Sequence, residues 1–297
     1  MFDGVSVALV TPFRKGDVDY DALDRLVDHV LQGGVDGLVP MGSTGEAGAL
    51  TPEERREILA RVKARAAGRA FIVPGTGSHS TRTTIEQTRQ AAGGGADGAM
   101  VVVPPYVKPT AAGQIAHFRA VADASEIPLI LYNVPGRTGA SMSSATALEL
   151  AGHPRIRAIK EASGSLDQAS RILRGGGLTL LSGEDSLTLP LMSIGAAGVV
   201  SVAGNLFPAA MVSLVRAARD GDLRRARSLH LALTPLFEAL FIESNPLPVK
   251  RALAGLGLVA EEFRLPLVPM GAETGERLDR VVAEVRADLA RLGDAVP

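Results

Sequence analysis

The feature that most limits the fold of this chain is a regular alternation of short apolar runs with amphipathic helical patterns. The apolar runs are four to six residues long, as is typical of strands. They fall at residues 5–10, 37–40, 71–74, 98–103, 128–132, 155–160, 178–182 and 198–202. Stretches between them, such as 21–32, 52–66 and 81–92, place apolar residues at helical spacing and charges on the opposite face. Eight strand–helix units of roughly 25 residues each predict a (β/α)8 barrel, an architecture of about 250 residues.

The helical patterns also carry boundary signals. Thr51-Pro-Glu-Glu54 predicts a helix start, with Thr51 as the N-cap, proline at the first helical position and Glu54 at the third. Residues 223–297 are predicted to be helical as well. Because no low-complexity linker separates them from residues 1–222, we expect a C-terminal helical layer packed on a barrel that carries the active site. A doubly wound sheet is the alternative, but its usual Gly-x-Gly-x-x-Gly turn is missing after the first strand.

Composition narrows the class of protein. The 297 residues are 46% hydrophobic and 21% charged, with a formal net charge of −1, which argues against nucleic acid or an anionic membrane as a partner. No run of about eighteen apolar residues occurs, and the N-terminus lacks the pattern of a signal peptide, so we expect a cytoplasmic location. The chain has no cysteine, and its five histidines lack close ligand spacing. We therefore expect no disulfide, no thiol nucleophile and no metal.

One lysine stands out from the others. Lys160 closes the apolar run at 155–160, in a chain with five lysines and twenty-six arginines. An amine at the end of a buried strand loses hydration, which disfavours the ammonium form, and the free amine is the form that attacks a ketone. Such a lysine can also simply extend to solvent. The remaining lysines lie in loops, on a charged helix face or in the C-terminal helical region: Lys15, Lys108, Lys63 and Lys250. Lys160 is therefore the candidate for a Schiff-base nucleophile.

In a barrel of this kind, reactive residues gather at the carboxyl ends of the strands. Polar and aromatic residues follow or end several of the predicted strands in this way: Ser43, Thr44, Tyr106, Tyr132, Lys160, Gly183 and Asp185. Side-chain alternation places Ile156, Ala158 and Lys160 on one face of their strand, and Ile159 and Glu161 on the other. If the first face points into the barrel, Glu161 does not pair directly with the amine.

Four motifs in order along the chain carry a resemblance to a known family. They are Met-Gly-Ser-Thr-Gly-Glu at 41–46, Tyr-Asn-Val-Pro-Gly-Arg-Thr-Gly at 132–139, Ile-Lys-Glu-Ala-Ser-Gly at 159–164 and Asn-Pro-Leu-Pro-Val-Lys at 245–250. Together they resemble the dihydrodipicolinate synthase / N-acetylneuraminate lyase family over nearly the whole chain. The resemblance implies a class I aldolase-type mechanism, in which Lys160 condenses with the keto group of pyruvate and the resulting enamine attacks an aldehyde. The covalent imine implies that no separate cofactor is needed.

The same resemblance assigns roles to the residues at the strand ends. Tyr132 would shuttle protons near the amine, since a phenol both donates and accepts. Ser43 would relay protons between Tyr132 and Tyr106, while Thr44 and nearby backbone N–H groups would hold the pyruvate carboxylate. Tyr106 would reach into the site of a neighbouring subunit, which implies a homodimer or a homotetramer of two tight dimers.

The resemblance further indicates what surrounds the substrates. Val200 would line the pyruvate pocket by its shape, and Gly183 through its backbone carbonyl. Arg137 would grip a carboxylate on the aldehyde, although a surface salt bridge is its simpler role. This favours L-aspartate 4-semialdehyde as the aldehyde and 4-hydroxy-tetrahydrodipicolinate as the product, on the way to diaminopimelate and lysine. Ser43 replaces the threonine of most synthases and agrees with the lyase-like branch, so a pyruvate-dependent aldolase or dehydratase of a sugar-derived 2-keto acid, such as N-acetylneuraminate or a 2-keto-3-deoxy sugar acid, remains an alternative.

Two non-catalytic alternatives also stay open. The chain could be a relative that keeps the pocket without turnover, or a phosphate-binding barrel that uses the glycine turns at 195–198 and 204–205, for which tight turns are the simpler role. The resemblance also implies that lysine-inhibited members of the family have an allosteric pocket near the dimer interface, built from polar residues after the Gly-Glu motif, an acid on the third helix and an adjoining tyrosine. The matching positions of this chain are Ala47, Thr83 and Pro105. We therefore expect free lysine not to inhibit the protein.

Overall fold

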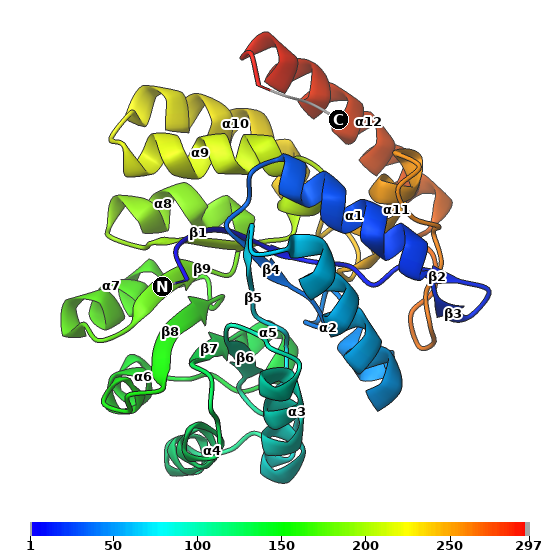
Figure 1. Cartoon of the computed structure of the whole chain (residues 1–297). Helices are drawn as coiled ribbons and strands as arrows, with labels where there is room; N and C mark the ends of the chain where they lie inside the picture. Colours follow the sequence, from blue (N-terminus) through cyan, green and yellow to red (C-terminus); the bar gives the residue numbers. More distant parts are fainter. Residues whose placement is uncertain (1, 295–297) are drawn as a thin grey trace.

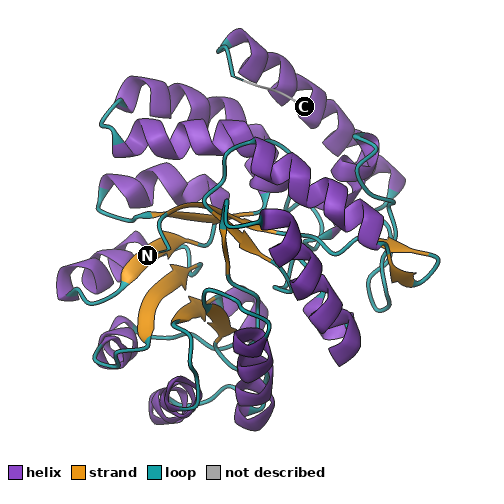
Figure 2. Ribbon diagram, in the orientation of Figure 1, coloured by secondary structure: helices purple, strands orange, loops and turns teal. Residues whose placement is uncertain are grey.

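The strands form a ring surrounded by helices in this computed structural model, which describes residues 2–294 (Figures 1 and 2). Within that range, eight parallel strands form one sheet in the order β5-β4-β1-β10-β9-β8-β7-β6. Their bounds are Gly4–Ala8 (β1), Gly37–Val39 (β4), Phe71–Ile72 (β5), Ala99–Val102 (β6), Leu129–Asn133 (β7), Ile156–Glu161 (β8), Thr179–Ser182 (β9) and Gly198–Ser201 (β10). The first and last of these strands, β1 and β10, pair directly, as closure into a barrel requires.

The two end strands of this order, β5 and β6, close the ring through a short seam. The segment after β5 carries the contacts, because Met100 N donates to Pro74 O at 2.9 Å and Thr76 N donates to Met100 O at 3.0 Å. An isolated parallel bridge joins Gly75 to Met100 at the same place. The predicted (β/α)8 barrel is therefore confirmed, and the doubly wound alternative is wrong.

Helices cover the outside of the ring (Figure 2). The α-helices are Tyr20–Gln32 (α1), Pro52–Ala66 (α2), Thr81–Gly93 (α3), Ala111–Asp123 (α4), Pro135–Thr138 (α5), Ser144–Ala151 (α6), Leu166–Gly175 (α7), Thr188–Ser193 (α8), Pro208–Arg219 (α9), Leu223–Ala239 (α10), Leu247–Gly255 (α11) and Ala272–Arg291 (α12). Short 3-10 turns lie at Ala47–Ala49 (η1), Asp185–Leu187 (η2) and Ala203–Asn205 (η3). No helix in the described part of the chain is long and apolar enough to cross a bilayer.

The sequence patterns located these elements closely. Each of the eight apolar runs forms a strand whose ends lie within two residues of those predicted. Helix α2 has the predicted bounds, and its capping box is complete: Glu54 N donates to Thr51 Oγ1 at 3.2 Å, and Thr51 N donates to Glu54 Oε2 at 2.8 Å. Helix α1 begins one residue earlier than predicted because Asp19 caps it, accepting from Ala22 N at 3.0 Å.

A small hairpin after β1 was not predicted. Strands Phe13–Arg14 (β2) and Asp17–Val18 (β3) pair antiparallel around Lys15 and Gly16, which both have positive φ (54° and 85°). The turn lies against the C-terminal part of the chain, because the Lys15 and Gly16 N–H groups both donate to the Glu262 carboxylate, at 2.8 and 2.5 Å. Gly16 was the available signal, since such turns need positive φ, which glycine adopts readily and lysine does not.

The sequence predicted which side chains of β8 point into the barrel, and this prediction is wrong for one residue, Ile156. A register shift pairs Leu129 with Ile156 but Ile130 with Ala158, so Arg157 is the extra residue of a β-bulge and is exposed. Ile156 consequently packs with Ile159 in the layer between strands and helices, and not inside the ring. From Ala158 onward the predicted alternation holds, because Ala158 belongs to the cluster inside the barrel.

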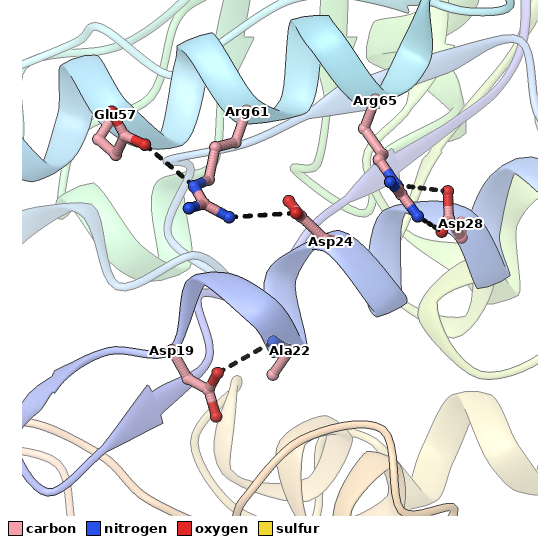
Figure 3. A network of polar contacts seen from close by, with 7 residues as sticks. All are labelled: Asp19, Ala22, Asp24, Asp28, Glu57, Arg61 and Arg65. Atoms are coloured by element: carbon pink, nitrogen blue, oxygen red, sulfur yellow. Dashed lines mark hydrogen bonds and ion pairs between the residues drawn. The ribbon is translucent and has the colours of Figure 1, made fainter.

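Arginine-rich ion pairs join α1 to α2 on the outside of the barrel (Figure 3). Arg61 bridges the two helices, with Nε donating to Glu57 at 2.9 Å and Nη1 donating to Asp24 at 3.1 Å. Arg65 meets Asp28 through two nitrogens, the fork geometry that lysine does not offer. These pairs are exposed to solvent, so water and salt screen them and they add little to stability.

The C-terminal helices extend the barrel's own core. Helix α10 packs against α9 and α12, and it begins at the 222/223 boundary drawn from the sequence. One cluster of buried apolar residues runs from β1 and α1 through α9 into α10 and α12, and includes Val5, Leu26, Met211, Leu233 and Leu289. The C-terminal segment therefore stabilises the side of the barrel on which α1 and α9 lie.

Candidate active site

The two central residues of the site lie side by side on neighbouring strands. Tyr132 on β7 is in register with Lys160 on β8, and both are buried, with 6% and 4% of their surfaces exposed. Lys160 Nζ lies over the Tyr132 ring, 4.2 Å from its centroid. Because residues in register on parallel strands point to the same face, the barrel brings the amine and the phenol together without a loop.

The next pair in register, Asn133 and Glu161, points to the other face. Asn133 Nδ2 donates to both Glu161 carboxylate oxygens, at 3.2 and 3.1 Å, and Gln168 Nε2 donates to Glu161 Oε2 at 3.0 Å. Ser163 N also donates to this carboxylate, at 2.8 Å. The Glu161 carboxylate is thus occupied on the outer side of the sheet and away from the amine, as alternation along β8 predicts.

A cavity of about 270 Å³ lies beside Tyr132 at the carboxyl end of the barrel. Its walls are apolar over most of their area and come from the loop after β4, the seam between β5 and β6, and the segment after β7. The residues that line it are Met41, Gly42, Ser43, Ala47, Gly48, Gly75, Gly77, Met100, Val102, Pro105, Tyr132, Val134, Arg137 and Thr138. Among these lining residues Arg137 alone is charged, so the cavity suits an anionic small molecule.

The loop after β4 presents its two hydroxyl residues differently. Ser43 is exposed and lines the cavity. Thr44 is buried, and its Oγ1 accepts a hydrogen bond from Asn245 Nδ2 at 2.9 Å. The loop is held as a turn, with Gly45 N donating to Gly42 O at 3.1 Å. Ser43 and Tyr132 therefore share one cavity, while Thr44 lies in the wall behind it.

Arg137 lies in the short helix α5, which follows β7 directly. Its Nη2 donates to the main-chain oxygen of Asn245 at 3.1 Å, and no carboxylate within residues 2–294 pairs with it. A guanidinium that has one neutral acceptor keeps most of its donors free for a carboxylate. The salt-bridge role considered for Arg137 is therefore wrong within the described chain.

Tyr106 does not lie with the other predicted residues. Its side chain is 91% exposed, and its backbone adopts a left-handed conformation with φ +71°. Tyr106 N donates to Thr138 O at 3.1 Å, which ties the segment after β6 to α5. An exposed aromatic ring on a strained, non-glycine backbone is unusual on a free surface. Within one chain, the proposed relay of Ser43 and Tyr132 thus lacks its third member.

Gly183 and Val200, at β9 and β10, are not among the residues that line this cavity. Val200 is buried inside the ring with Tyr132. Gly183 N donates to Glu161 O at 2.8 Å, and a Cβ on Gly183 would meet Ala162 Cβ at 2.5 Å, so no side chain fits there. The family resemblance assigned both residues to the pyruvate pocket, and that assignment stays a prediction. Gly183 directly follows β9, and Val200 is the third of the four residues of β10.

Asp185 is a buried acid that the sequence argument quoted without giving it a role. Its Oδ1 accepts from Ser201 Oγ at 2.5 Å, and its Oδ2 accepts from the N–H groups of Val202 and Ala203 at 3.0 and 2.9 Å. Burial raises the pKa of the Asp185 carboxyl, whereas these three donors and the Lys160 charge lower it. Asp185 fixes the turn after β10. Its place in the Gly-Glu-Asp motif was the available signal.

Other candidate ligand sites are weaker. Within residues 2–294, no group of three or more His, Asp or Glu side chains is placed to hold a metal ion. Of the glycines considered for phosphate, Gly198 has no room for a side chain, because a Cβ would meet Gly4 O at 1.9 Å. The Gly204 N–H donates to Ser201 Oγ at 2.8 Å and is not free for an anion. These glycines serve the backbone, which favours the simpler role given to them.

Comparison with known proteins agrees with this geometry. The model of the dihydrodipicolinate synthetase family matches residues 1–285. A 4-hydroxy-tetrahydrodipicolinate synthase of Pelobacter propionicus is 50% identical over 273 residues, which cover 91% of this chain and 94% of that protein. The crystal structure of dihydrodipicolinate synthase from Aquifex aeolicus superposes with a TM-score of 0.93 at 45% identity, covering 95% of this chain and 98% of that one. The 4-hydroxy-tetrahydrodipicolinate synthase of Methylacidiphilum fumariolicum superposes with a TM-score of 0.97 at 40% identity, covering 99% of both chains.

Proposed function

Because the chain belongs to the dihydrodipicolinate synthetase family, we propose that it condenses pyruvate with L-aspartate 4-semialdehyde to give 4-hydroxy-tetrahydrodipicolinate, in the route to diaminopimelate and lysine. It is an enzyme of the carbon–carbon lyase type that acts on small molecules. The pair formed by Lys160 and Tyr132 carries the proposal, because it puts a buried amine beside a phenol at the carboxyl end of a barrel, where such enzymes do their chemistry.

The first half of the reaction forms a covalent intermediate on Lys160. The neutral Nζ attacks the keto carbon of pyruvate, and loss of water leaves an imine. Removal of a proton from the pyruvate methyl group gives the enamine, with the imine nitrogen taking up the electron pair. Tyr132 is next to the nitrogen and serves as the acid and base for these transfers. The imine supplies the electron sink, so no separate cofactor takes part.

The second half joins the two substrates. The enamine carbon attacks the aldehyde carbon, a carbon–carbon bond forms, and the aldehyde oxygen takes a proton. The amino group of the semialdehyde then attacks the imine carbon, which closes the ring and releases Lys160 as the amine. Ser43 lines the same cavity as Tyr132 and is proposed to relay protons to and from the phenol.

The charge of the site supports a reaction between two substrates that each carry a carboxylate. Each substrate brings one carboxylate, and we assign the pyruvate carboxylate to Thr44 with nearby N–H groups and that of the semialdehyde to Arg137. Among the lining residues Arg137 alone is charged, and its guanidinium contacts a neutral carbonyl. Val200 and Gly183 are proposed to bound the pyruvate pocket by shape and by a backbone carbonyl. Sugar aldehydes, which carry no carboxylate, would gain little from Arg137.

Pyruvate consumption tests the proposed reaction. The purified protein would receive pyruvate with matched concentrations of L-aspartate 4-semialdehyde, N-acetylmannosamine or glyceraldehyde, and Lys160→Ala would serve as the control. We expect selective consumption with the semialdehyde, absent in the control. Preference for a sugar aldehyde would overturn the proposal in favour of the aldolase branch indicated by Ser43. Absence of turnover with every aldehyde would favour a binding role.

Arg137→Ala tests the aldehyde specificity separately. Loss of a charge-assisted, bidentate contact should lower kcat/KM for the semialdehyde by about tenfold to a hundredfold. The KM for pyruvate should change little, because we assign its carboxylate to Thr44. Measuring kcat/KM for the semialdehyde and for glyceraldehyde gives the selectivity ratio. A ratio equal to that of the unchanged protein would remove the role proposed for Arg137.

Tyr106 supports assembly into a homo-oligomer, either a dimer or a tetramer of two tight dimers. Its exposed ring and left-handed backbone suit insertion into the site of a second copy. Hybrids of Lys160→Ala and Tyr106→Phe subunits test this. If Tyr106 acts across the interface, the hybrid has one complete site and regains activity that neither parent shows. If Tyr106 acts within its own chain, mixing the subunits restores nothing.

A further inference from the structure

Asn245 lies where the two proposed carboxylate-binding groups meet. Its main-chain oxygen accepts from Arg137 Nη2 at 3.1 Å, and its side-chain Nδ2 donates to Thr44 Oγ1 at 2.9 Å. The residue is 5% exposed and lies between α10 and α11, 108 residues from Arg137 and 201 residues from Thr44. One residue of the C-terminal segment therefore contacts both groups.

The direction of the hydrogen bond to Thr44 matters for anion binding. A threonine hydroxyl has one hydrogen and two lone pairs, and an amide NH₂ group can only donate. When Asn245 Nδ2 occupies a lone pair of Thr44, the hydroxyl hydrogen has to point to another acceptor. A carboxylate is such an acceptor, and the bond it receives is charge-assisted. Asn245 thus prepares Thr44 to donate.

The rest of the Asn245 side chain is not used by the fold. Its Oδ1 is buried and has no hydrogen-bond partner among residues 2–294. Leaving a buried acceptor unsatisfied costs stability, so a purely structural asparagine would be expected to use both ends of its amide. The one hydrogen bond that the amide forms within the described chain is with Thr44.

The backbone around Asn245 is anchored to the same loop. Lys250, five residues later on α11, is fully buried, and its Nζ donates to Glu46 Oε1 at 2.7 Å. Glu46 follows Thr44 by two residues. The segment from Asn245 to Lys250 therefore holds the loop after β4 at two points, which fixes the position of Thr44 as well as the direction of its hydroxyl.

We propose that Asn245 is a positioning residue that directs the Thr44 hydroxyl to the pyruvate carboxylate and, through its main-chain oxygen, orients Arg137 for the carboxylate of the aldehyde. This inference rests on the function proposed above. Its consequence is that the two carboxylates are held at a fixed separation by one rigid segment, which lies outside the strands that carry Lys160 and Tyr132.

Asn245→Asp and Asn245→Ala test the proposal. In Asn245→Asp the side chain can only accept, so Thr44 donates to it and no longer to pyruvate, and the KM for pyruvate should rise by about tenfold or more. Asn245→Ala should raise this KM less, by roughly threefold to tenfold, since the hydroxyl becomes free to turn. The value of kcat at saturating pyruvate should stay within about threefold for both variants, because the reacting groups are unchanged.

A double-mutant cycle separates positioning from general damage to the fold. If Asn245 acts through Thr44, Asn245→Ala should have no further effect on the KM for pyruvate in a Thr44→Val background. Asn205→Ala is the matched control, because Asn205 is also fully buried and its Nδ2 donates to Ala8 O at 2.8 Å and Val202 O at 3.0 Å. We expect it to lower the unfolding temperature without a selective rise in the KM for pyruvate.

The outcomes separate the failure of this inference from that of the proposed function. An unchanged KM for pyruvate in Asn245→Asp, or an effect of Asn245→Ala that persists undiminished in the Thr44→Val background, would overturn the role of Asn245. If Asn245→Asp does not fold, the cycle with Asn245→Ala decides. If borohydride and pyruvate leave no adduct on the unchanged protein, the imine mechanism itself is refuted, and the positioning role falls with it.

Discussion

Two buried lysines lie in two regions of this molecule, and the two regions treat their amines differently. Lys160, at the carboxyl end of β8, has an aromatic ring beside it and forms no ion pair among the described residues. Lys250, on α11, donates to the Glu46 carboxylate at 2.7 Å and to Glu262 O at 2.6 Å, and lies 4.4 Å from the ring centroid of Phe13. The first amine is 4% exposed and the second 0%.

The difference teaches that burial alone does not make a nucleophile. Burial lowers the pKa of the Lys250 amine, but the Glu46 carboxylate opposes this and holds the ammonium in place. An ammonium ion has no lone pair, so a lysine that a carboxylate keeps protonated cannot attack a ketone. Lys160 is beside the ring of Tyr132, which lines the cavity, and no carboxylate among the described residues pairs with its nitrogen.

A third buried base extends the comparison. His117 on α4 is 6% exposed, and its Nδ1 shares a hydrogen bond of 2.9 Å with Thr81 Oγ1. Its Nε2 is buried without a partner among residues 2–294, and burial lowers the pKa of His117 to about 4. This base therefore stays neutral at ordinary pH. Of these three buried bases, Lys160 lies beside a tyrosine that lines a cavity, Lys250 forms an ion pair, and His117 stays neutral.

The largest expected effect follows from removing the amine of Lys160. Lys160→Ala should abolish the borohydride-stable pyruvate adduct and lower kcat on the order of 10³-fold or more. The unfolding temperature should not fall, since no ion pair is lost within the described chain. Mass spectrometry of the intact protein and of its peptides would locate the adduct. An adduct found on Lys250 would break the comparison between the two lysines.

Removing the amine of Lys250, which is paired with Glu46, should instead lower the stability of the fold. Lys250→Met leaves Glu46 buried without its partner, so the free energy of unfolding should fall by about 3–5 kcal/mol. The double variant Lys250→Met, Glu46→Gln should recover part of this loss. Arg251→Met is a control in the same helix, because its pairs with Glu261 and Asp279 are partly exposed and contribute about 1 kcal/mol or less.

Urea denaturation would measure these three variants. The comparison fails if Lys250→Met is no less stable than Arg251→Met, since the ion pair would then not be what holds α11 against the loop after β4. A double variant as unstable as the single one would show that packing of the lysine stem, and not the unpaired carboxylate, accounts for the loss.

Because His117 stays neutral in the folded protein, it should affect how the stability of the fold depends on pH. The pKa of His117 is about 4 in the folded protein and about 6.5 when unfolded, so below pH 6.5 the unfolded state binds a proton that the native state refuses. The contribution of His117 is therefore lost as the pH falls from 6.5 to about 4, by up to about 3 kcal/mol. His117→Gln should flatten the stability curve in this window. Parallel curves for the two proteins would show that His117 does not stay neutral.

The smallest effect is expected from free lysine, which should not change the reaction rate. A lysine ammonium group needs a carboxylate and other polar acceptors to replace its hydration. At the positions expected to supply polar groups, the acid and the tyrosine, this chain has Ala47, Thr83 and Pro105, none of which carries a charge. Initial rates at millimolar lysine should equal those without it. A dose-dependent fall in rate would show that other side chains form such a pocket.

Local sequence patterns predicted the ring and the residues at its carboxyl end. The apolar runs located the strands because parallel strands of a barrel are buried on both faces. Alternation placed Lys160 inside the ring and Glu161 outside, but it failed at Ile156, since a β-bulge is one extra residue and leaves no mark in the hydrophobic pattern.

Contacts between distant residues could not be predicted in this way. Asn245 contacts a residue 201 positions away, and Lys250 contacts one 204 positions away. Nothing in the pattern around Lys250 distinguishes a buried lysine on α11 from an exposed one, so its ion pair depends on tertiary packing. The exposure of Tyr106 was likewise hidden from the sequence, because the left-handed backbone that presents it is not a preference of tyrosine.

The seam between β5 and β6 has a consequence for how this scaffold can diverge. Gly75, Gly77, Met100 and Val102 belong to the seam, and all four line the cavity, whereas Lys160 lies on β8, two strands away from β6 in the ring. A Cβ on Gly75 would meet Met41 O at 2.3 Å, so the variable part of this wall is confined to Met100 and Val102. Substitutions at Met100 and Val102 could therefore change which substrate the cavity accepts during evolution, while the reactive Lys160 stays unchanged.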